Sequence, residues 1–315
     1  MPASDPESSQ AIRAVWLHYA GGLTQAAVAK RLGIPSVKAH RLIARAVADG
    51  VVKVSIDGDI VECIDFEGRL AARFGLDFCE VAPDLGESGL PLRALGLAGA
   101  GFLRREIERG EDRVIGLGHG RTLAAAVQHL PRLDAKGVRF VSLLGGFTRN
   151  YAANPYDVMH RLAERTAAQA YVMPAPFFAN SVEDREVFLE QRGVREVFEM
   201  AEKASLKFVG IGTVDPQAQL VSSGMIEPAE IAEIAAAGGV GELLGHFFDA
   251  EGRIMATTLT GRTLAAPVGE PGKHRMVAIA GGAEKVAAIA AVLVSRRLTG
   301  LITDECTAKA LLGEA

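Results

Sequence analysis

The stretch that decides the fold is Thr24–Gly50, TQAAVAKRLGIPSVKAHRLIARAVADG. Thr24 stands where a helix N-cap belongs, because its hydroxyl can accept a hydrogen bond from a backbone N–H of the first turn. Gly33 suits the end of that helix, and Pro35 cannot extend it. The apolar residues that predict one buried face on this short helix are Ala27, Val28 and Leu32.

A second helix is predicted from Ser36 to a stop at Gly50. Two helices joined by a tight turn that contains glycine make a helix-turn-helix, whose second helix enters a DNA major groove. The apolar positions that we expect to be buried on it are Val37, Leu42, Ile43 and Ala46. The candidate DNA-contacting residues of the two helices are Thr24, Gln25, Ser36, Lys38, His40, Arg41 and Arg45.

The charge of this region supports the DNA-binding interpretation. Between Ala11 and Asp57 there are seven Lys and Arg residues and two Asp residues, in a chain whose net charge is −4. A basic head on an acidic body is typical of a module that binds phosphates. The alternative is a basic, solvated helical hairpin that binds no DNA. Residues 51–57 alternate apolar and polar side chains and are expected to form a strand, a candidate wing on which Lys53 could reach a phosphate.

Length and composition indicate two domains in a cytoplasmic protein. The chain has 315 residues, 49% hydrophobic and 23% charged, too many for one small domain. A helix is expected at residues 11–20, with Trp16 in the core of the head.

Three cysteines without metal-ligand spacing fit buried thiols in a reducing compartment. No apolar run is long enough for a membrane span, and the polar opening MPASDPESSQ does not resemble a signal peptide. We predict a DNA-binding domain at residues 1–58 and a second domain at residues 59–315.

Residues 59–315 alternate predicted strands with predicted helices. A connector at residues 59–75, with a helix starting near Phe66, leads into this region. Strands are expected at 78–83, 114–118, 138–146, 170–176, 206–212, 276–282 and 298–304, with an edge or antiparallel strand at 253–259. Helices are expected at 91–109, 122–129, 155–169, 182–191, 194–204, 227–237, 283–295 and 305–312. Repeated βα units with Val/Ile/Leu-rich strands predict an α/β fold, a Rossmann-like doubly wound sheet.

Ligands of such sheets bind beyond the carboxyl ends of the strands, so the loops that follow the strands are the candidate site. The loop Gly118-His119-Gly120-Arg121-Thr122 ends a strand and opens a helix. Its free N–H groups, its glycines and the cationic Arg121 predict an anion cradle, although a glycine turn needed only for packing is the alternative. The other candidate loops are Gly145-Gly146 with Arg149, Asn150 and Asn154, then Gly281-Gly282 with Lys285, and Thr303-Asp304-Glu305, where Thr303 or Asp304 could act only as an N-cap.

The residues do not predict a nucleophile triad, a metal site or a cofactor. The seven histidines are scattered, and His119 is the one that lies in a candidate loop. A sugar-phosphate isomerase needs a carboxylate base near a lysine, and Glu242, Asp249 and Lys285 could form that set. An isomerase-like enzyme with a DNA-binding head is therefore the alternative, but the fused helix-turn-helix favours ligand sensing by a protein that is not an enzyme.

The chain resembles the SorC family of bacterial transcriptional regulators from about Ile12 to Leu312. The motifs that carry the resemblance are LTQAAVAKRLG, VIGLGHGRTL, MPAP, FVGIGTVD, GELLGHFFDAEG, VAIAGGAEKVAAI and LITDE. The resemblance implies an effector domain related to sugar-phosphate isomerases, a dimer or tetramer, and a phosphorylated sugar as effector. It places the effector at Gly120, Arg121, Thr122, Asn154, Glu242 and Lys285; the loop residues Gly118, His119 and Gly146, and Asp249, complete our candidate set.

Two departures from the family pattern bear on specificity. The recognition helix reads PSVKAHR, where many members have Ser-Arg-x-Thr-Val-Ser-Arg, so only Arg41 is retained and a divergent operator is expected. Some members that sense a bisphosphate carry an arginine where this chain has Leu144, and its absence removes a bidentate partner for a second phosphate. We therefore expect a monophosphate, an unphosphorylated sugar or a polyol. Within the family, the chain also resembles the regulators of erythritol catabolism. The predicted function is a repressor of a carbohydrate or polyol catabolic operon.

Overall fold

The computed structural model describes residues 6–49, 51–52, 61–111, 113–148, 154, 156–271 and 275–314. The chain divides into two compact units, Met1–Gly58 and Asp59–Ala315, and each unit has a hydrophobic core of its own.

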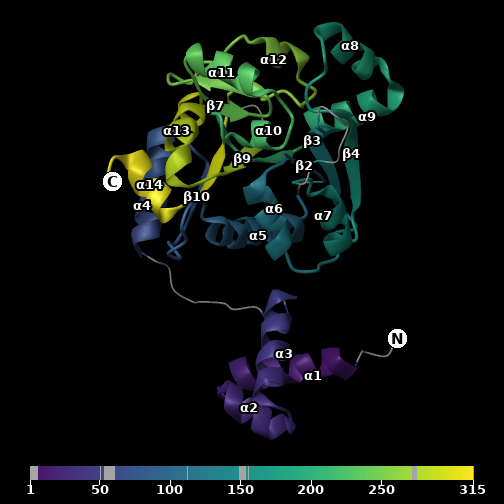
Figure 1. The fold of residues 1–315 in the computed structure, drawn as a ribbon, viewed down its shortest axis with the longest axis vertical. Helices are drawn as coiled ribbons and strands as arrows, with labels where there is room; N and C mark the ends of the chain where they lie inside the picture. The colour runs from purple at the N-terminus through teal and green to yellow at the C-terminus, as the bar shows by residue number, and fades with distance from the viewer. Residues whose placement is uncertain are drawn as a thin grey trace. The chain divides into compact units, whose positions relative to one another are not determined.

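The small unit is a bundle of helices (Figure 1). Its core is rich in alanine. Its elements are α1 (Pro6–Val15), the π-helical turn η1 (Trp16–Ala20), α2 (Gln25–Leu32) and α3 (Ser36–Ala48). Thr24 caps α2 by accepting a hydrogen bond from Ala27 N at 3.2 Å, and Gly33 ends it in the left-handed conformation, with φ of 64°. The helix-turn-helix is therefore confirmed by its caps as well as by its helices. Its buried residues are Ala11, Ala14, Val15, Val28, Ala29, Ala39, Leu42, Ile43 and Ala46.

Three expectations about the small unit are wrong. The first helix begins at Pro6 and not at residue 11. Val37 is 81% exposed, because the buried face of α3 runs through Ala39, Leu42, Ile43 and Ala46, and residue 37 lies on another side of that helix. Trp16 is 65% exposed, since small residues of α1 fill the core in its place. Gly50 and residues 53–57 of the predicted wing, with Lys53, lie outside the described residues.

The large unit is built on a seven-stranded sheet whose neighbouring strands all pair in parallel. The strand order is β1-β10-β9-β5-β2-β3-β4. The predicted doubly wound α/β fold is thereby confirmed. The strands are β1 (Phe78–Ala82), β2 (Val114–Leu117), β3 (Arg139–Phe147), β4 (Gln169–Pro176), β5 (Leu206–Val209), β9 (Arg275–Ile279) and β10 (Gly300–Asp304).

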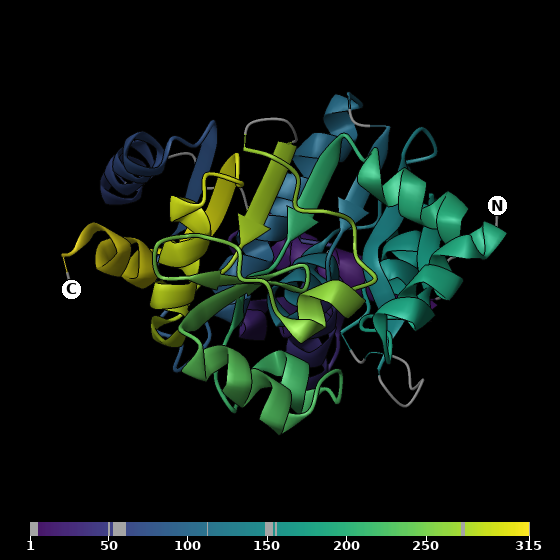
Figure 2. The same cartoon turned by 90° about the horizontal axis from the view of Figure 1, so that it is seen from above.

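Helices cover both faces of this sheet, which explains its continuous apolar strands (Figures 1 and 2). On β5, Phe208 contributes to the core beneath α5 and α6, while its neighbour Val209 contributes to the core on the opposite face. The helices are α4 (Val61–Phe74), α5 (Leu92–Arg109), α6 (Arg121–His129), α7 (Met159–Thr166), α8 (Val182–Glu190), α9 (Arg192–Glu202), α10 (Gln219–Ser222), α11 (Pro228–Ala236), α12 (Thr258–Arg262), the 3₁₀ turn η2 (Ala283–Lys285), α13 (Val286–Val294) and α14 (Glu305–Leu312).

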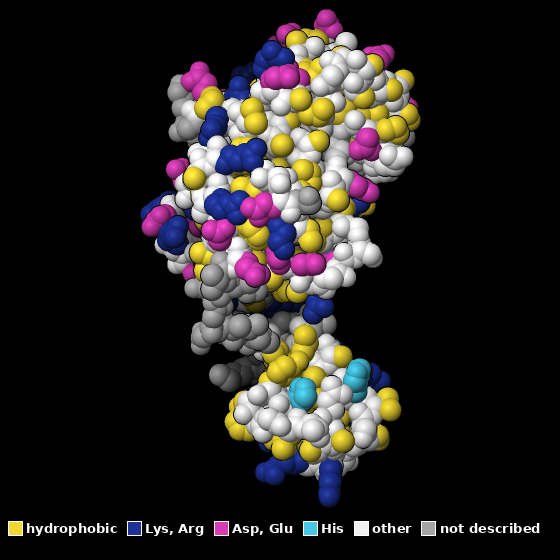
Figure 3. Space-filling model, turned by 90° about the vertical axis from the view of Figure 1, so that its left-hand side faces the viewer, with side chains coloured by type: hydrophobic (Ala, Val, Ile, Leu, Met, Phe, Trp, Pro, Cys, Tyr) yellow, Lys and Arg dark blue, Asp and Glu magenta, His cyan; other side chains and the backbone are white. Residues whose placement is uncertain are grey.

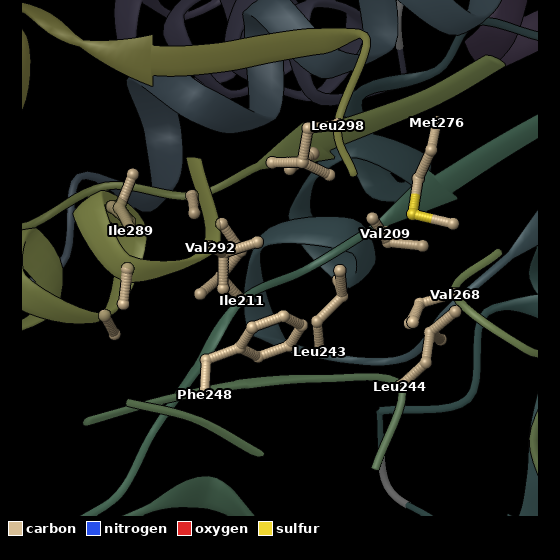
Figure 4. Close-up of a cluster of buried hydrophobic side chains, with 14 of the residues drawn as sticks. Val209, Ile211, Leu243, Leu244, Phe248, Val268, Met276, Ile289, Val292 and Leu298 are labelled. Carbon is tan, nitrogen blue, oxygen red and sulfur yellow. The ribbon is translucent and has the colours of Figure 1, made fainter. Parts of the chain in front are cut away.

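A second, antiparallel sheet of three strands lies in the large unit: β6 (Gly212–Thr213), β7 (Gly239–Leu243) and β8 (His246–Asp249). Figure 4 shows how it packs, with Leu243, Leu244 and Phe248 directed toward side chains of the main sheet and of α13. Of the antiparallel strand expected at residues 253–259, the structure has a single antiparallel bridge between Ile254 and Phe248, and α12 begins at Thr258. The hairpin lies one segment earlier, and its two-residue turn holds Leu244 and Gly245 at φ of 50° and 75°. Such a turn favours Asn or Gly at both positions. Because Leu244 is not a typical turn residue, the sequence did not indicate this hairpin.

Other boundaries also differ from the prediction. The connector helix α4 begins at Val61, five residues before Phe66, and α7 ends at Thr166, so that Gln169 already belongs to β4. Pro155, the expected start of that helix, lies outside the described residues. The expectation of buried thiols holds for Cys63 only, because Cys79 is half-buried and Cys306 is exposed.

Replacing Phe208 tests the two-sided core. Phe208 is fully buried and its ring lies 5.1 Å from that of Phe102, so Phe208→Ala should destabilise the large unit by about 3–5 kcal/mol through lost contacts and a cavity. The measurement is urea unfolding. The matched control Val187→Ala, at a position 57% exposed on α8, should stay within about 0.5 kcal/mol of wild type. Equal effects of the two substitutions would contradict this core assignment.

Candidate functional site

The strand order creates one position where the chain changes direction across the main sheet. From β2 the chain adds β3 and β4 on one side, and it then returns to place β5 on the other side of β2. Crossovers that leave neighbouring strands toward opposite faces open a crevice at their carboxyl ends. Here that crevice lies beyond Leu117 and Val209, the last residues of β2 and β5.

A cavity of ≈ 70 Å³ occupies this position. That volume holds several water-sized groups, because one water needs about 10–15 Å³ on the same measure. Two glycine loops form its floor, one after β2 and one after β5. The lining residues are Gly118, His119, Gly120, Arg121, Thr122, Leu144, Asn154, Phe177, Gly210, Ile211, Gly212, Thr213, Gln219, Leu220, Met225, Glu242, Leu244 and Lys285.

The loop after β2 brings a helix N-terminus and a guanidinium to the cavity. Gly120 stands before α6 with φ of 136°, a backbone conformation that residues other than glycine rarely adopt. Arg121 is the first residue of α6, and its Nε is buried without a hydrogen-bond partner among the described residues. Thr122 fixes the start of this helix, since its hydroxyl donates to the carbonyl of Ile279 at 3.0 Å. The arrangement presents N–H donors and positive charge to whatever fills the cavity.

His119 is committed to a hydrogen-bond network. Asn154 Nδ2 donates to its Nδ1 at 2.7 Å, so Nε2 carries the ring proton and faces Ser142 Oγ at 3.3 Å. Ser142 in turn donates to the carbonyl of Leu144 at 2.7 Å. Burial lowers the pKa of His119 to about 4, against the opposing effect of the Asp157 carboxylate, which agrees with a neutral ring. His119 therefore holds Asn154 in place and supplies no cation.

The opposite wall carries a carboxylate and an ammonium group. Glu242 on β7 accepts a hydrogen bond from Gly245 N at 2.6 Å, and its other oxygen would lie only 2.4 Å from a Cβ at position 212, so any side chain there would displace the carboxylate. Lys285 donates to the carbonyl of Ile211 at 2.6 Å. Burial raises the pKa of Glu242 to about 7. Burial, reinforced by the Arg121 guanidinium, lowers the pKa of Lys285 to about 8.

Eight of the ten residues predicted for the effector site line this cavity, and Gly146 and Asp249 do not. Gly146 lies on β3 against β4, and its carbonyl accepts from Asn154 N at 3.3 Å, so it supports the wall without forming it. Asp249 is a correction. At the end of β8 its carboxylate is bound by Arg253 at 2.7 Å, because a turn follows the strand there.

Two other predicted loops have structural roles. The Gly281-Gly282 pair packs on Asp304, which accepts a hydrogen bond from Gly282 N at 3.1 Å. Asp304 also caps α14 by accepting a hydrogen bond from Thr307 N at 3.0 Å. The loop Thr303-Asp304-Glu305 therefore follows the alternative in which Asp304 acts as an N-cap. Arg149 and Asn150 lie outside the described residues.

Ten of the eighteen lining residues are not in the predicted effector set, among them Gly210, Gly212 and Gln219. Gly210 and Gly212 repeat, after β5, the Gly-x-Gly spacing found after β2, and this repetition was a signal available in the sequence. Gln219 comes from the four-residue helix α10, which nothing in the sequence distinguished.

The candidate DNA-contacting residues lie on the surface of the small unit. Lys38, Arg41 and Arg45 follow each other at spacings of three and four along α3, which places them on one stripe. Arg41 and Arg45 are exposed and Lys38 is half-buried; Arg45 also forms an ion pair with Asp49 at 3.6 Å. Figure 3 shows Lys and Arg side chains at the lower end of this unit. The remaining candidates are Thr24, Ser36 and His40, which are exposed, and Gln25, which is half-buried.

Neither a membrane span nor a metal cluster is found in the part of the chain that the structure describes. No helix in it is long and apolar enough to cross a bilayer. Among the same residues, no group of three or more His, Cys, Asp or Glu side chains is arranged to hold a metal ion.

Comparison with known proteins assigns the family. Residues 58–313 match the model of the Sugar-bind family, a sugar-binding domain. The chain is also 68% identical to the erythritol catabolism regulatory protein EryD of Brucella abortus, over 99% of this chain and 98% of the relative. The chain belongs to the SorC family of sugar-binding transcriptional regulators.

Other members of the family are similar to this chain over nearly the full length of both proteins. The transcriptional regulator LsrR of Klebsiella pneumoniae is 33% identical, over 98% of this chain and 94% of LsrR. The crystal structure of the full-length sorbitol operon regulator SorC from Klebsiella pneumoniae is 26% identical, with a TM-score of 0.71 over 98% of this chain and 99% of that one. The family resemblance predicted from the motifs is confirmed.

The raised pKa of Glu242 predicts a pH dependence of stability. Its folded pKa of about 7 lies above the ordinary 4.5, so its contribution to stability is complete below pH 4.5 and is lost as pH rises through 7. Between pH 5 and pH 8 the wild type should therefore lose stability relative to Glu242→Gln, as measured by melting temperature without ligand.

The matched control is Asp249→Asn. The Arg253 ion pair lowers the pKa of Asp249 below 3.8, so its contribution is present above that value and does not change between pH 5 and pH 8. The difference in melting temperature between Asp249→Asn and the wild type should not change between pH 5 and pH 8. A flat profile for Glu242→Gln as well would show that Glu242 is not desolvated in the folded protein.

Proposed function

We propose that this chain is a DNA-binding repressor of a polyol or carbohydrate catabolic operon, whose affinity for DNA is controlled by a small effector in the cavity beyond β2 and β5. The observation that carries the proposal is a cavity lined by Arg121, whose Nε is buried without a hydrogen-bond partner among the described residues, in a family member with a helix-turn-helix. A donor left unpaired in this way is costly unless a ligand group completes it.

The two units divide the work in this proposal. Residues 1–58 bind double-stranded operator DNA, with Arg41 as the base-reading candidate on α3 and with Lys38 and Arg45 beside it. Residues 59–315 bind the effector and hold the homo-oligomer, a dimer or tetramer. An oligomer suits a helix-turn-helix protein because two heads can occupy two half-sites of one operator. The protein would act where the DNA is, in the cytoplasm.

The effector is a small polyol, a sugar or its monophosphate. The names of two relatives include a polyol: the erythritol catabolism regulatory protein EryD and the sorbitol operon regulator SorC. The cavity is small, and Leu144 presents an apolar side chain where a second phosphate would need a cation. Arg121 and Thr122 would hold one end of the ligand, and Lys285, Glu242 and Asn154 the other.

Regulation follows from differential affinity. The oligomer exists in DNA-binding and released states, and an effector that binds the released state more tightly shifts the population toward it. No chemical step is required of Glu242 or Lys285 for this. They serve as hydrogen-bonding groups for hydroxyls.

One observation favours a second function, a sugar-phosphate isomerase. Glu242 has a pKa of about 7 and shares a cavity with Lys285, which suits a general base beside a cation. Such an enzyme would convert aldose phosphates into ketose phosphates, and Glu242→Gln would abolish the turnover. An assay of the full-length protein with a panel of sugar phosphates distinguishes the two functions.

Arg121→Ala should uncouple sensing from DNA binding. Loss of a charged donor to the ligand should weaken effector binding by about 10-fold to 100-fold and leave operator affinity unchanged. The measurements are thermal shift and operator titration with C4–C6 polyols, the corresponding sugars and their monophosphates. A ligand at about 100 times its dissociation constant should raise the free energy of unfolding of the wild type by roughly 2.7 kcal/mol.

The matched control is Arg253→Ala, which removes an arginine outside the cavity that pairs with Asp249. It should respond to effector like wild type. Loss of operator binding in Arg121→Ala alone would contradict the division of roles between the two units.

Arg41→Ala should weaken binding to an operator selected from random DNA by the full-length protein. If Arg41 reads a base, the loss is about 1–3 kcal/mol on the operator and much smaller on random duplex. Fluorescence anisotropy at fixed salt measures both. Arg13→Ala on α1 is the matched control and should leave specificity unchanged. An equal loss on both duplexes would assign Arg41 to a phosphate.

A further inference from the structure

Gln219 occupies the N-terminal end of α6 inside the cavity. Its carboxamide Oε1 accepts a hydrogen bond from Arg121 N at 3.4 Å, although the two residues are 98 positions apart in the chain. The same oxygen would lie 3.7 Å from a Cβ built on Gly120. A side chain from α10 thus contacts the loop that the effector is proposed to occupy.

This contact is a weak substitute for what a helix N-terminus binds best. N–H···O hydrogen bonds are strongest at about 2.7–3.2 Å, and the contact of Gln219 is longer than that. The amide oxygen carries only a partial negative charge, whereas the helix dipole and the free N–H groups favour a full anion. An oxyanion at the same point would form shorter, charge-assisted hydrogen bonds.

A second, independent observation points to the same ligand class. Arg121 Nε is buried without a partner in the described chain, on the residue whose backbone N–H contacts Gln219. The backbone N–H of Arg121 is therefore only weakly satisfied, and its Nε–H has no partner among the described residues. Both are suited to oxygen atoms of a single oxyanion.

The backbone that carries Gln219 is fixed, so the side chain is the part free to leave. Ala218 and Leu220 on either side of it are buried. The carbonyl of Leu220 also accepts hydrogen bonds from Met225 N at 2.9 Å and Ile226 N at 3.2 Å. Rotation of the Gln219 side chain would vacate the end of α6 without moving this segment.

We propose that Gln219 is a built-in competitor of the effector, which occupies the anion position at the start of α6 and is displaced by an oxyanion of the ligand. This inference rests on the proposed function and deepens it. The ligand class becomes an oxyanion carrier, and a phosphate monoester fits this position. Gln219 sets the concentration at which the cavity fills, because the ligand must replace its contact before binding.

Inorganic phosphate is the probe that tests this inference on the full-length protein, with its dissociation constant measured by calorimetry. Gln219→Ala removes the competitor and should bind phosphate about 2-fold to 10-fold more tightly than wild type, the equivalent of one weak hydrogen bond. Gln219→Glu places a tethered carboxylate at the same point and should bind phosphate more weakly than wild type. Gln217→Ala, on the exposed side of the same segment, is the matched control and should bind as wild type does.

Each other outcome overturns the inference. Weaker binding by Gln219→Ala would make Gln219 an ordinary ligand contact, and unchanged binding would remove it from the site. Tighter binding by Gln219→Glu would also contradict competition. If phosphate binds neither wild type nor Gln219→Ala, the position does not bind anions, yet the proposed function survives where a neutral sugar or polyol changes operator affinity. The proposed function itself fails if no member of that panel changes operator affinity.

Discussion

The parallel pairing of β2 with both β3 and β5 is the constraint on which the site depends. Because the chain leaves β2 in one direction and returns on the other side, two loops end at the same crevice from sequence positions about ninety residues apart. Glycine has a different role in each loop: Gly120 adopts a φ of 136° before α6, whereas a Cβ on Gly212 would lie 2.4 Å from the Glu242 carboxylate. The cavity is thus a consequence of strand order, and its chemistry comes from the residues at the strand ends.

Burial then determines how those residues behave. The two cationic side chains, Arg121 and Lys285, and the carboxylate of Glu242 share a space that excludes most water, and each charge is costly there without a partner. Internal contacts satisfy part of this need: Ile211 accepts from Lys285, and Gly245 donates to Glu242. The guanidinium of Arg121 is the group whose Nε is left over within the described structure. The cavity is therefore lined by two cationic groups and one carboxyl group, with a buried donor of Arg121 unpaired among the described residues.

The main sheet and the first glycine loop could be predicted because their signals are local. Short, mainly apolar stretches marked the seven parallel strands, and Gly118–Thr122 combines glycine, a cation and a helix start in five adjacent residues. The misses required information about distant contacts. Trp16 was assigned to the core because it is apolar, whereas closely packed alanines leave it outside. Asp249 was expected beside Glu242, but an arginine of the turn after β8 binds its carboxylate. Gln219 gave no signal, since its contact spans 98 residues and depends on how α10 packs.

A ligand in this cavity would contact two layers of the fold at once. Arg121 and Thr122 belong to the first turn of α6, a helix of the main sheet, whereas Glu242 belongs to the small antiparallel sheet and Lys285 to the turn before α13. These layers meet through the apolar cluster that includes Leu243, which has no directional bonds to fix their spacing (Figure 4). A ligand that bridges the polar residues supplies directional bonds between the layers. Its binding free energy can therefore depend on their relative position, which is the condition for an effector to favour one state of the protein over another.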